Sequence, residues 1–322
     1  MKTKNIFLTA LVAISSTAFG QQIGLNSQYL FNEMVINPGA TGTKDYTQVQ
    51  LNFRKQWVRF PDSPTSQNVS ANAYIGKNFG LGGIVTNEVA GPSRHTSLGI
   101  NMSYLLPLSK DRNHKLGMGM GLSMGQHIID ETKLSTYLPN DPAVTRGFNN
   151  IMVPDANVGV FYYFKDKAFA GLSAKNLVQM NRDLYTFENP LLNLNVRNYY
   201  LIGGYNFKLS EKFDLKATTL LQAIETGTWQ GDITLLGIYA KRLWLGGSYR
   251  HNDAVVFMGG AKFGPFRFGY SYDYTLSDIG DYSTGSHEVF LELQLTSRQK
   301  NGNGDGTKTP WIKRNRLYSQ GR

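Results

Sequence analysis

Hydrophobic and polar residues alternate along most of the chain, from about residue 46 to residue 296. In the run at residues 48–53, Gln48, Gln50 and Asn52 alternate with apolar neighbours, and residues 97–104 and 288–295 repeat the pattern. Successive side chains of a strand point to opposite faces, so each run has one apolar and one polar face. The pattern predicts strands whose two faces meet different environments.

Fourteen such runs follow one another, and the connections between them are alternately short and long. The predicted strands are residues 46–54, 67–76, 79–87, 95–106, 115–127, 156–165, 168–175, 197–208, 212–223, 229–240, 243–251, 254–263, 265–274 and 286–296. Outer-membrane barrels have an even number of strands, short periplasmic turns and long outer loops. The sequence therefore predicts an all-β protein, a single transmembrane antiparallel β-barrel of about 14 strands with both termini in the periplasm.

The connections divide into two sets, which would lie at opposite ends of the barrel. The predicted short turns are residues 76–78, 107–114, 165–167, 209–211 and 241–242, and the turn around residue 264. The predicted outer loops are residues 55–66, 87–94, 128–155, 176–196, 223–228, 251–253 and 274–285. The two longest contain several aromatic residues and prolines, so we expect them to fold over the mouth or to bind a partner.

The chain outside the barrel has three predicted parts. Residues 1–20 combine two lysines, a short apolar run and small residues before Gln21, which is typical of a cleavable signal peptide. Residues 21–45 precede the first strand as a periplasmic or plug segment. Residues 297–322 form a basic tail behind the flexible stretch NGNGDGT, and the tail would lie in the periplasm. We expect the mature protein to reside in the outer membrane of a Gram-negative cell.

Composition narrows the remaining chemistry. The 322 residues include no cysteine, so disulfides, thiolate metal sites and cysteine-linked lipids are excluded. No later stretch is apolar for long enough to form a transmembrane helix. The net charge of +10 arises largely from the ends of the chain. For an exported protein, the basic tail favours phospholipid head groups, glycan or acidic proteins over nucleic acid, and a solvated tail without a ligand remains an alternative.

Short motifs occur in two groups, one near the start of the mature chain and one in the last third of the predicted barrel. The first is Gln28, Tyr29, Leu30, Phe31 and Asn32, then Ile36, Asn37, Pro38, Gly39 and Ala40, then Arg54, Gln56, Trp57, Pro61 and Pro64. The second is Trp244, Leu245 and Gly246, Ser248, Tyr249 and Arg250, residues 269–273 (GYSYD), and Gly285, Ser286, His287 and Glu288. Together they resemble the PorP/SprF family, outer-membrane proteins that accompany the type IX secretion system of Bacteroidetes. The family typically has alanine and tyrosine after the Asn-Pro pair, where this chain has Gly39 and Ala40.

The resemblance implies a non-enzymatic barrel that binds the C-terminal domain of a cognate exported protein, often an adhesin, and supports its secretion or surface retention. Its partners would be that exported domain, other type IX components and outer-membrane lipid, and gliding motility is one process such proteins serve. No cofactor is implied. The candidate partner-binding or structural residues are Tyr29, Phe31, Asn32, Asn37, Pro38, Arg54, Gln56, Trp57, Arg250, Asp273, His287 and Glu288.

These candidates have specific chemical roles. Asn37, Pro38 and Gly39 predict a turn before the first strand, in a segment that either plugs the lumen or packs at the rim. Arg54, Gln56 and Trp57 open the first outer loop, where the guanidinium would pair with cargo, lipopolysaccharide or an internal carboxylate. Arg250, Asp273, His287 and Glu288 lie near outer strand ends, where a polar network inside the barrel is the favoured interpretation.

Catalysis is disfavoured on geometric grounds. Ser286, His287 and Asp273 are the residue types of a nucleophilic site, but neighbours in a strand point to opposite faces, so Ser286 and His287 would not act together. No metal-binding spacing is present. Two other classes remain open: a porin or solute channel, in which the polar face lines water, and a β-rich surface adhesin that is not embedded in a membrane.

Overall fold

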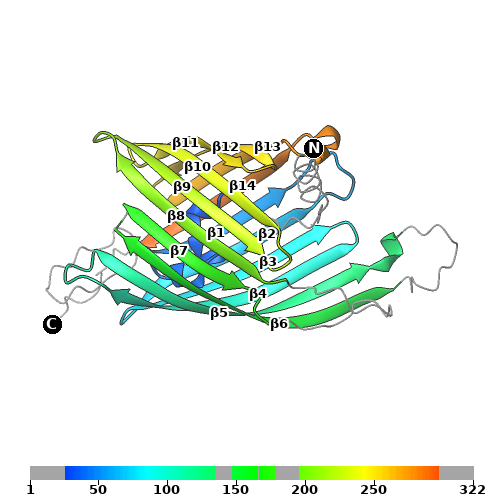
Figure 1. The fold of residues 1–322 in the computed structure, drawn as a ribbon, viewed down its shortest axis with the longest axis horizontal. Helices are drawn as coiled ribbons and strands as arrows, with labels where there is room; N and C mark the ends of the chain where they lie inside the picture. Colours follow the sequence, from blue (N-terminus) through cyan, green and yellow to red (C-terminus); the bar gives the residue numbers. More distant parts are fainter. Residues whose placement is uncertain (1–25, 135–146, 166, 179–195, 297–322) are drawn as a thin grey trace, which may run out of the picture.

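The computed structural model describes residues 26–134, 147–165, 167–178 and 196–296, and its strands form one closed antiparallel barrel (Figure 1). The strands are β1 (Tyr46–Lys55), β2 (Thr65–Gly76), β3 (Phe79–Ala90), β4 (Ser93–Pro107), β5 (His114–Asp130), β6 (Phe148–Phe164), β7 (Ala168–Lys175), β8 (Asn198–Lys208), β9 (Phe213–Ile224), β10 (Trp229–Tyr239), β11 (Leu243–Arg250), β12 (Ala254–Phe263), β13 (Phe266–Thr275) and β14 (Ser286–Thr296). Each strand pairs with its neighbours in sequence, and β1 pairs with β14 to close the ring. The predicted fold class and its fourteen strands are confirmed.

Two of the predicted outer connections are wrong in extent. β5 continues to Asp130 and β6 begins at Phe148, so residues 148–155, expected in a loop, all belong to a strand. Proline has no N–H to donate to a strand ladder, so Pro154 within β6 needs an explanation. β6 pairs with β7 only from Val158 onward, so Pro154 lies outside the β6–β7 hydrogen-bond ladder. The missing N–H of Pro154 therefore breaks no hydrogen bond to β7. Likewise β3 and β4 extend to Ala90 and Ser93, which reduces the expected loop to a tight turn.

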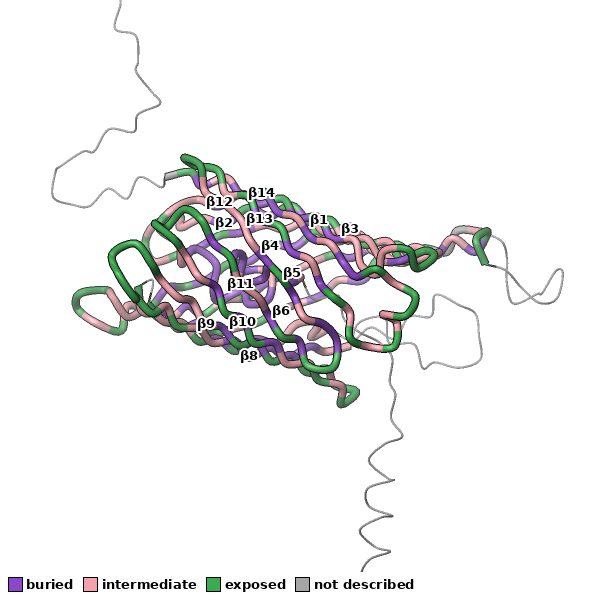
Figure 2. Tube along the Cα trace, turned by 90° about the horizontal axis from the view of Figure 1, so that it is seen from above, coloured by how far each residue is buried: buried purple, intermediate pink, exposed green. Residues whose placement is uncertain are grey.

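Burial along the strands is inverted relative to that of a soluble protein. The side chains of Gln48, Gln50 and Asn52 face the lumen and are buried, whereas Leu51 and Phe53 face outward and are exposed. Figure 2 shows buried and exposed positions alternating along the strands. This arrangement is expected for a barrel whose outer face meets lipid.

The outer surface has the layered composition of a membrane-spanning barrel. Exposed aliphatic residues such as Ile100, Leu122, Ile233 and Leu245 occupy the middle of their strands. Exposed aromatic residues lie towards the strand ends: Phe79, Tyr104, Tyr205, Phe207, Phe213, Tyr239 and Phe266 at the short-turn end, and Tyr199, Trp229, Tyr249 and Tyr274 at the opposite end. Aromatic girdles at both membrane interfaces are characteristic of such barrels.

Several sequence predictions fall outside the described residues: the signal peptide at residues 1–20, residues 21–25 of the segment that follows it, the basic tail at 297–322, and the central parts of the two longest loops, residues 135–146 and 179–195. Across the described ranges, no helix is long and apolar enough to cross a bilayer.

A charge on the outer face should destabilise the barrel according to its depth. Ile100→Arg places a guanidinium at mid-strand on the lipid face, and we expect a loss of about 2–4 kcal/mol in the free energy of unfolding. Leu209→Arg, in a short turn, should cost less than about 1 kcal/mol. Urea titrations of the protein refolded into lipid vesicles measure both values, and equal losses would contradict the proposed membrane position.

Candidate functional site: the lumenal plug

Residues 26–44, here called the plug, lie inside the barrel (Figures 1 and 2). They form three short 3-10 helices, η1 (Tyr29–Phe31), η2 (Glu33–Val35) and η3 (Pro38–Ala40). Ser27 lies near the ends of β1 and β14 that adjoin the long connections, while Gly42 approaches Gly80 near the short-turn end. The plug therefore runs through the lumen from the long-connection end to the start of β1.

A buried serine ties the beginning of the plug to the wall. The backbone N–H of Ser27 donates to Glu288 at 2.7 Å, and its hydroxyl donates to Asp273 at 2.8 Å. The same hydroxyl oxygen accepts hydrogen bonds from Arg54 at 3.1 Å and Arg250 at 2.9 Å. One side chain thus joins two guanidinium groups and a carboxylate that come from three different strands.

The charged groups around Ser27 form an arginine cluster made of Arg54, Asp232, Arg250, Asp253, Asp273 and Glu288. Arg54 pairs with Asp273 at 2.7 Å and Glu288 at 3.2 Å. Arg250 pairs with Asp273 at 3.1 Å, Asp232 at 3.3 Å and Asp253 at 3.4 Å. Since ions removed from water are stable only when paired, this cluster strongly constrains the positions of both arginines.

The Asn-Pro-Gly turn fastens the middle of the plug to the opposite wall. The Asn37 side chain accepts a hydrogen bond from the N–H of Gly39 at 2.8 Å, which caps η3. Its amide nitrogen donates to the carbonyls of Val160 at 2.9 Å and Leu172 at 3.3 Å. Asn37 therefore shapes the turn and binds it to the backbone of β6 and β7.

The Asn-Pro-Gly turn also lies against β5, and it can approach this strand closely only because the strand carries glycine there. The lumenal face of β5 carries glycine at positions 117, 119, 121 and 125. A Cβ atom at Gly117 would lie 2.0 Å from the carbonyl oxygen of Gly39, and one at Gly119 would lie 2.3 Å from the carbonyl carbon of Pro38. Any larger residue would displace the turn, so the glycine stripe of β5 creates the space in which the plug sits.

An apolar cluster fills the lumen between the plug and strands β6 to β14. Its plug members are Tyr29, Leu30, Phe31, Ile36 and Ala40, and its wall members include Phe161, Tyr200, Ile202, Leu220, Leu236, Trp244, Val256, Met258 and Phe290. The Phe31 ring lies 5.2 Å from Trp244 and 5.0 Å from Phe290, measured between centroids, and the guanidinium of Arg267 lies 5.5 Å from the Phe31 centroid. The plug is thus held by a hydrophobic core of its own.

A salt bridge secures the far end of the plug. Lys44 pairs with Glu33 at 3.1 Å and also donates to the carbonyl of Phe31 at 2.6 Å. Burial acts to raise the pKa of Glu33, but the neighbouring Lys44 and Lys216 outweigh it and hold that pKa below its ordinary value. Stabilisation by this pair is therefore present above the ordinary carboxyl pKa and is lost as the pH falls through the lowered one.

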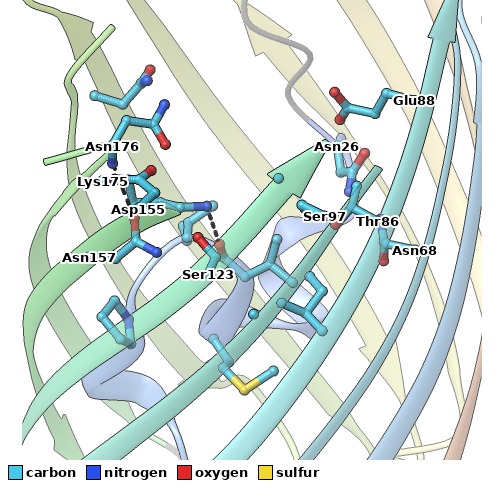
Figure 3. Close-up of a pocket in the computed structure, with 18 of the residues that line it drawn as sticks. Asn26, Asn68, Thr86, Glu88, Ser97, Ser123, Asp155, Asn157, Lys175 and Asn176 are labelled. Atoms are coloured by element: carbon cyan, nitrogen blue, oxygen red, sulfur yellow. Dashed lines mark hydrogen bonds between the residues drawn. The ribbon is translucent and has the colours of Figure 1, made fainter. Parts of the chain in front are cut away.

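A polar cavity of about 450 Å³ lies beside the plug, towards the long connections (Figure 3). Asn68, Thr86 and Ser97 line one side, and Asp155, Asn157 and Lys175 line the other. The N–H of Asn176 donates to the Asn157 side chain at 3.1 Å, and Lys175 donates to the plug carbonyl of Val35 at 2.9 Å. The plug forms part of the cavity wall through residues such as Asn32, Met34 and Pro38.

The structure brings together most of the residues singled out in the sequence. Tyr29, Phe31, Asn32, Asn37 and Pro38 all lie in the plug, where the amide of Asn32 donates to Ser70 at 2.7 Å. Arg54, Arg250, Asp273 and Glu288 share the arginine cluster. Among the alternatives for Arg54, the internal carboxylate is the partner observed.

Three candidates lie apart from this group. The backbone N–H of Gln56 donates to Pro64, and that of Trp57 donates to the Ser286 hydroxyl at 3.1 Å, so both residues shape the first outer connection. The prediction that His287 joins the inner network is wrong. Its ring lies on the outer face, with Nδ1 2.7 Å from the Tyr270 hydroxyl, because it precedes the inward-facing Glu288.

Ser27 and two members of the arginine cluster, Asp232 and Asp253, stand in no motif recognised in the sequence. The apolar packing of the plug, in contrast, had a sequence signal that the strand analysis missed. Strands β9 to β14 contain neighbouring apolar pairs, such as Leu220 with Leu221, Leu235 with Leu236 and Phe290 with Leu291. Where both faces of a barrel strand are apolar, the lumen must hold an apolar partner, which here is the plug.

The fold and the occupied lumen define an outer-membrane β-barrel with an internal plug. Residues 18–293 match the family model described as type IX secretion system membrane protein PorP/SprF. The chain therefore belongs to the PorP/SprF family, as the sequence resemblance predicted. A search of curated proteins found no match.

Solved structures with a similar fold are also outer-membrane barrels. The CymD monoaromatic hydrocarbon channel is similar with a TM-score of 0.52 and 12% identity, over 87% of this chain and 95% of that one. The Ralstonia pickettii toluene transporter TbuX has a TM-score of 0.48 and 8% identity, over 82% and 92% of the two chains. At this identity, the likeness to CymD supports the fold alone.

Removing the Ser27 hydroxyl should loosen the start of the plug. Ser27→Ala deletes hydrogen bonds to two arginines and one carboxylate, which removes one hydrogen-bond partner from each of these buried charged groups and costs about 1–3 kcal/mol. We expect faster hydrogen exchange in the plug, measured by mass spectrometry of the detergent-solubilised protein. Ser271→Ala is the control, since the Ser271 hydroxyl is also buried but has no hydrogen-bond partner among the residues that the structure describes. Equal hydrogen exchange in the plug of the two variants would contradict the role of Ser27 in holding the plug.

A methyl group on the glycine stripe should push the Asn-Pro-Gly turn out of place. The cysteine-free chain allows a single reporter, Ala40→Cys, in the buried part of the plug. Adding Gly119→Ala should speed maleimide labelling of this cysteine roughly tenfold or more, which corresponds to about 1.4 kcal/mol of lost docking. Adding Gly203→Ala should not, because its Cβ would approach no atom closer than 3.8 Å. If the cysteine at position 40 is still labelled slowly in the Gly119→Ala variant, close approach of the turn to Gly119 does not hold the plug in place.

Proposed function

We propose that this barrel binds the C-terminal domain of a cognate exported protein at the long-connection end and supports its secretion or surface retention. Membership of the type IX secretion family implies association with secretion components. The observation that carries the proposal is the occupied lumen: the plug packs against strands around the ring, so the outer rim and connections are the surfaces left for a large partner. In this role the protein acts by binding, without catalysis.

Apolar side chains on the long connections support a docking role for that end. Phe60, Leu134, Leu276 and Tyr282 lie outside the strands, and Tyr282 is 72% exposed. Met152, near the start of β6, is 54% exposed. Apolar groups outside the lipid band are favourable only when a partner covers them, which makes this rim the expected interface.

A porin or solute channel is the alternative function. An open channel needs a continuous water path, and the apolar cluster around Tyr29, Leu30 and Phe31 fills the lumen along the plug. This packing favours the accessory function over passive permeation. If the exported partner is an adhesin, support of gliding motility follows as one cellular role of the same binding step.

Shortening the two longest outer loops should release the partner. We expect affinity purification of the tagged protein from native outer membrane to recover type IX components and one large exported protein. Replacing residues 135–146 or 179–195 with a short Gly-Ser linker should abolish recovery of the exported protein. Altering the short turn at residues 109–112 at the other end should not.

Two readouts keep this test decisive. Heat-modifiable migration on a gel shows that each variant still forms a barrel, and it separates a membrane barrel from a soluble adhesin. Conductance in a planar bilayer distinguishes an accessory protein of the secretion system from a solute channel. Steady ion flow through the wild-type protein, together with unchanged partner recovery after loop replacement, would overturn the proposed function.

A further inference from the structure

The polar cavity beside the plug has a lining that the anchoring of the plug does not explain. Asn68 on β2 and Asn157 on β6 are more than nine-tenths buried. The side chain of Asn68 makes no hydrogen bond within the described part of the chain, and that of Asn157 uses only its oxygen, which accepts from the N–H of Asn176. Both side chains contribute to the cavity wall, from opposite sides (Figure 3).

Hydroxyl groups continue this lining between the two amides. Thr86 on β3, Ser97 on β4 and Ser123 on β5 lie along the same wall, and in the described structure their hydroxyls have no hydrogen-bond partner. Amide and hydroxyl groups both donate and accept. The arc from β2 to β6 therefore presents neutral donors and acceptors to whatever occupies the cavity.

The charged groups of the cavity already have contacts within the protein. Lys175 donates to the carbonyl of Val35, Asp155 accepts from the N–H groups of Ala156 at 2.7 Å and Val178 at 3.2 Å, and Glu88 lies 3.9 Å from His95. A peptide entering the cavity by its end would bring a carboxylate or an ammonium, and to bury that charge it would have to draw Lys175 or Asp155 away from these contacts. A neutral ligand leaves them in place and is therefore preferred.

Flat surfaces complement the polar arc. The imidazole rings of His95 and His127 stack with centroids 4.1 Å apart and line the cavity, as do Ile84, Val153 and Tyr200. The lining thus combines neutral hydrogen-bonding groups with apolar and ring faces. A sugar matches both properties, since its hydroxyls donate and accept while its C–H faces are apolar.

We propose that this cavity binds a neutral, hydroxyl-rich oligosaccharide that approaches from the long-connection end. The volume of about 450 Å³ falls within the range of small-molecule sites. This binding is separate from the docking of an exported protein on the outer connections. The chemistry is shared by free oligosaccharides and by the glycan chains of membrane lipids, so the test must treat these sources separately.

The test uses the full-length protein purified in detergent. Isothermal titration is carried out with maltotetraose, cellotetraose and mannotetraose, with an acidic uronic tetrasaccharide, and with a tetrapeptide that has free termini. Polysaccharide released from lipopolysaccharide of the host cell is titrated beside these free sugars to distinguish the two sources. We expect binding of at least one neutral glycan and none of the peptide.

Substitutions in the cavity lining test whether the glycan binds in this cavity. Asn68→Leu and Asn157→Leu should each weaken the Kd roughly fivefold to tenfold, because each removes one or two hydrogen bonds to the ligand. Asn150→Leu, the same change at an exposed position of β6 outside the cavity lining, is the control. Heat-modifiable migration confirms that every variant forms a barrel.

Each outcome decides the proposal. Neutral glycan binding that weakens in the two cavity variants and not in the control supports it. Absence of binding to every neutral glycan, including the released polysaccharide, overturns it, as does equal affinity in the cavity variants. Binding of the tetrapeptide in place of sugars would assign the cavity to a peptide end. Loss of exported-protein recovery alone has no bearing here, so the two proposals fail separately.

Discussion

Closure of the sheet between β1 and β14 is the constraint on which the rest of this structure depends. In lipid every backbone N–H and C=O needs a partner within the protein, and a closed ring provides one on both sides of each strand. Closure also sets Arg54 opposite Glu288 in the ladder, and β13, the next strand, brings Asp273 opposite Ser286, two residues from Glu288 along β14. The pairing that satisfies the backbone thereby assembles the charges that hold Ser27, so barrel closure and plug anchoring are physically linked.

The plug combines three kinds of attachment, each with its own physical basis. Ion pairs and hydrogen bonds hold Ser27 at the long-connection end. Backbone contact with the glycine stripe holds the Asn37 turn, and aromatic packing around Phe31 fills the space between. Because these attachments use strands on different sides of the ring, the plug also braces the barrel from within.

The lumen is divided by chemistry. Strands β9 to β14 present apolar residues such as Leu236 and Val256 to the plug, whereas β2 to β6 present Asn68, Thr86 and Asn157 to a polar cavity. The first surface is covered by internal packing, and the second presents hydrogen-bonding groups to the cavity. An occupied lumen of this kind leaves the rim as the surface for the proposed macromolecular binding, which agrees with membership of a secretion-system family.

The sequence by itself determined the barrel, because strand alternation is a local property with a period of two residues, and it appears in each run from Tyr46 to Thr296. It also indicated the Asn37-Pro38-Gly39 turn of the plug and four of the six residues of the arginine cluster, which are Arg54, Arg250, Asp273 and Glu288. It misplaced His287 on the inner face, and it began the sixth strand at residue 156 where β6 begins at Phe148. Only the tertiary structure decided that Ser27 meets Arg54, Arg250 and Asp273, and that Gly119 receives Pro38, because these contacts join residues far apart in the chain and arise only once the ring is closed around the plug.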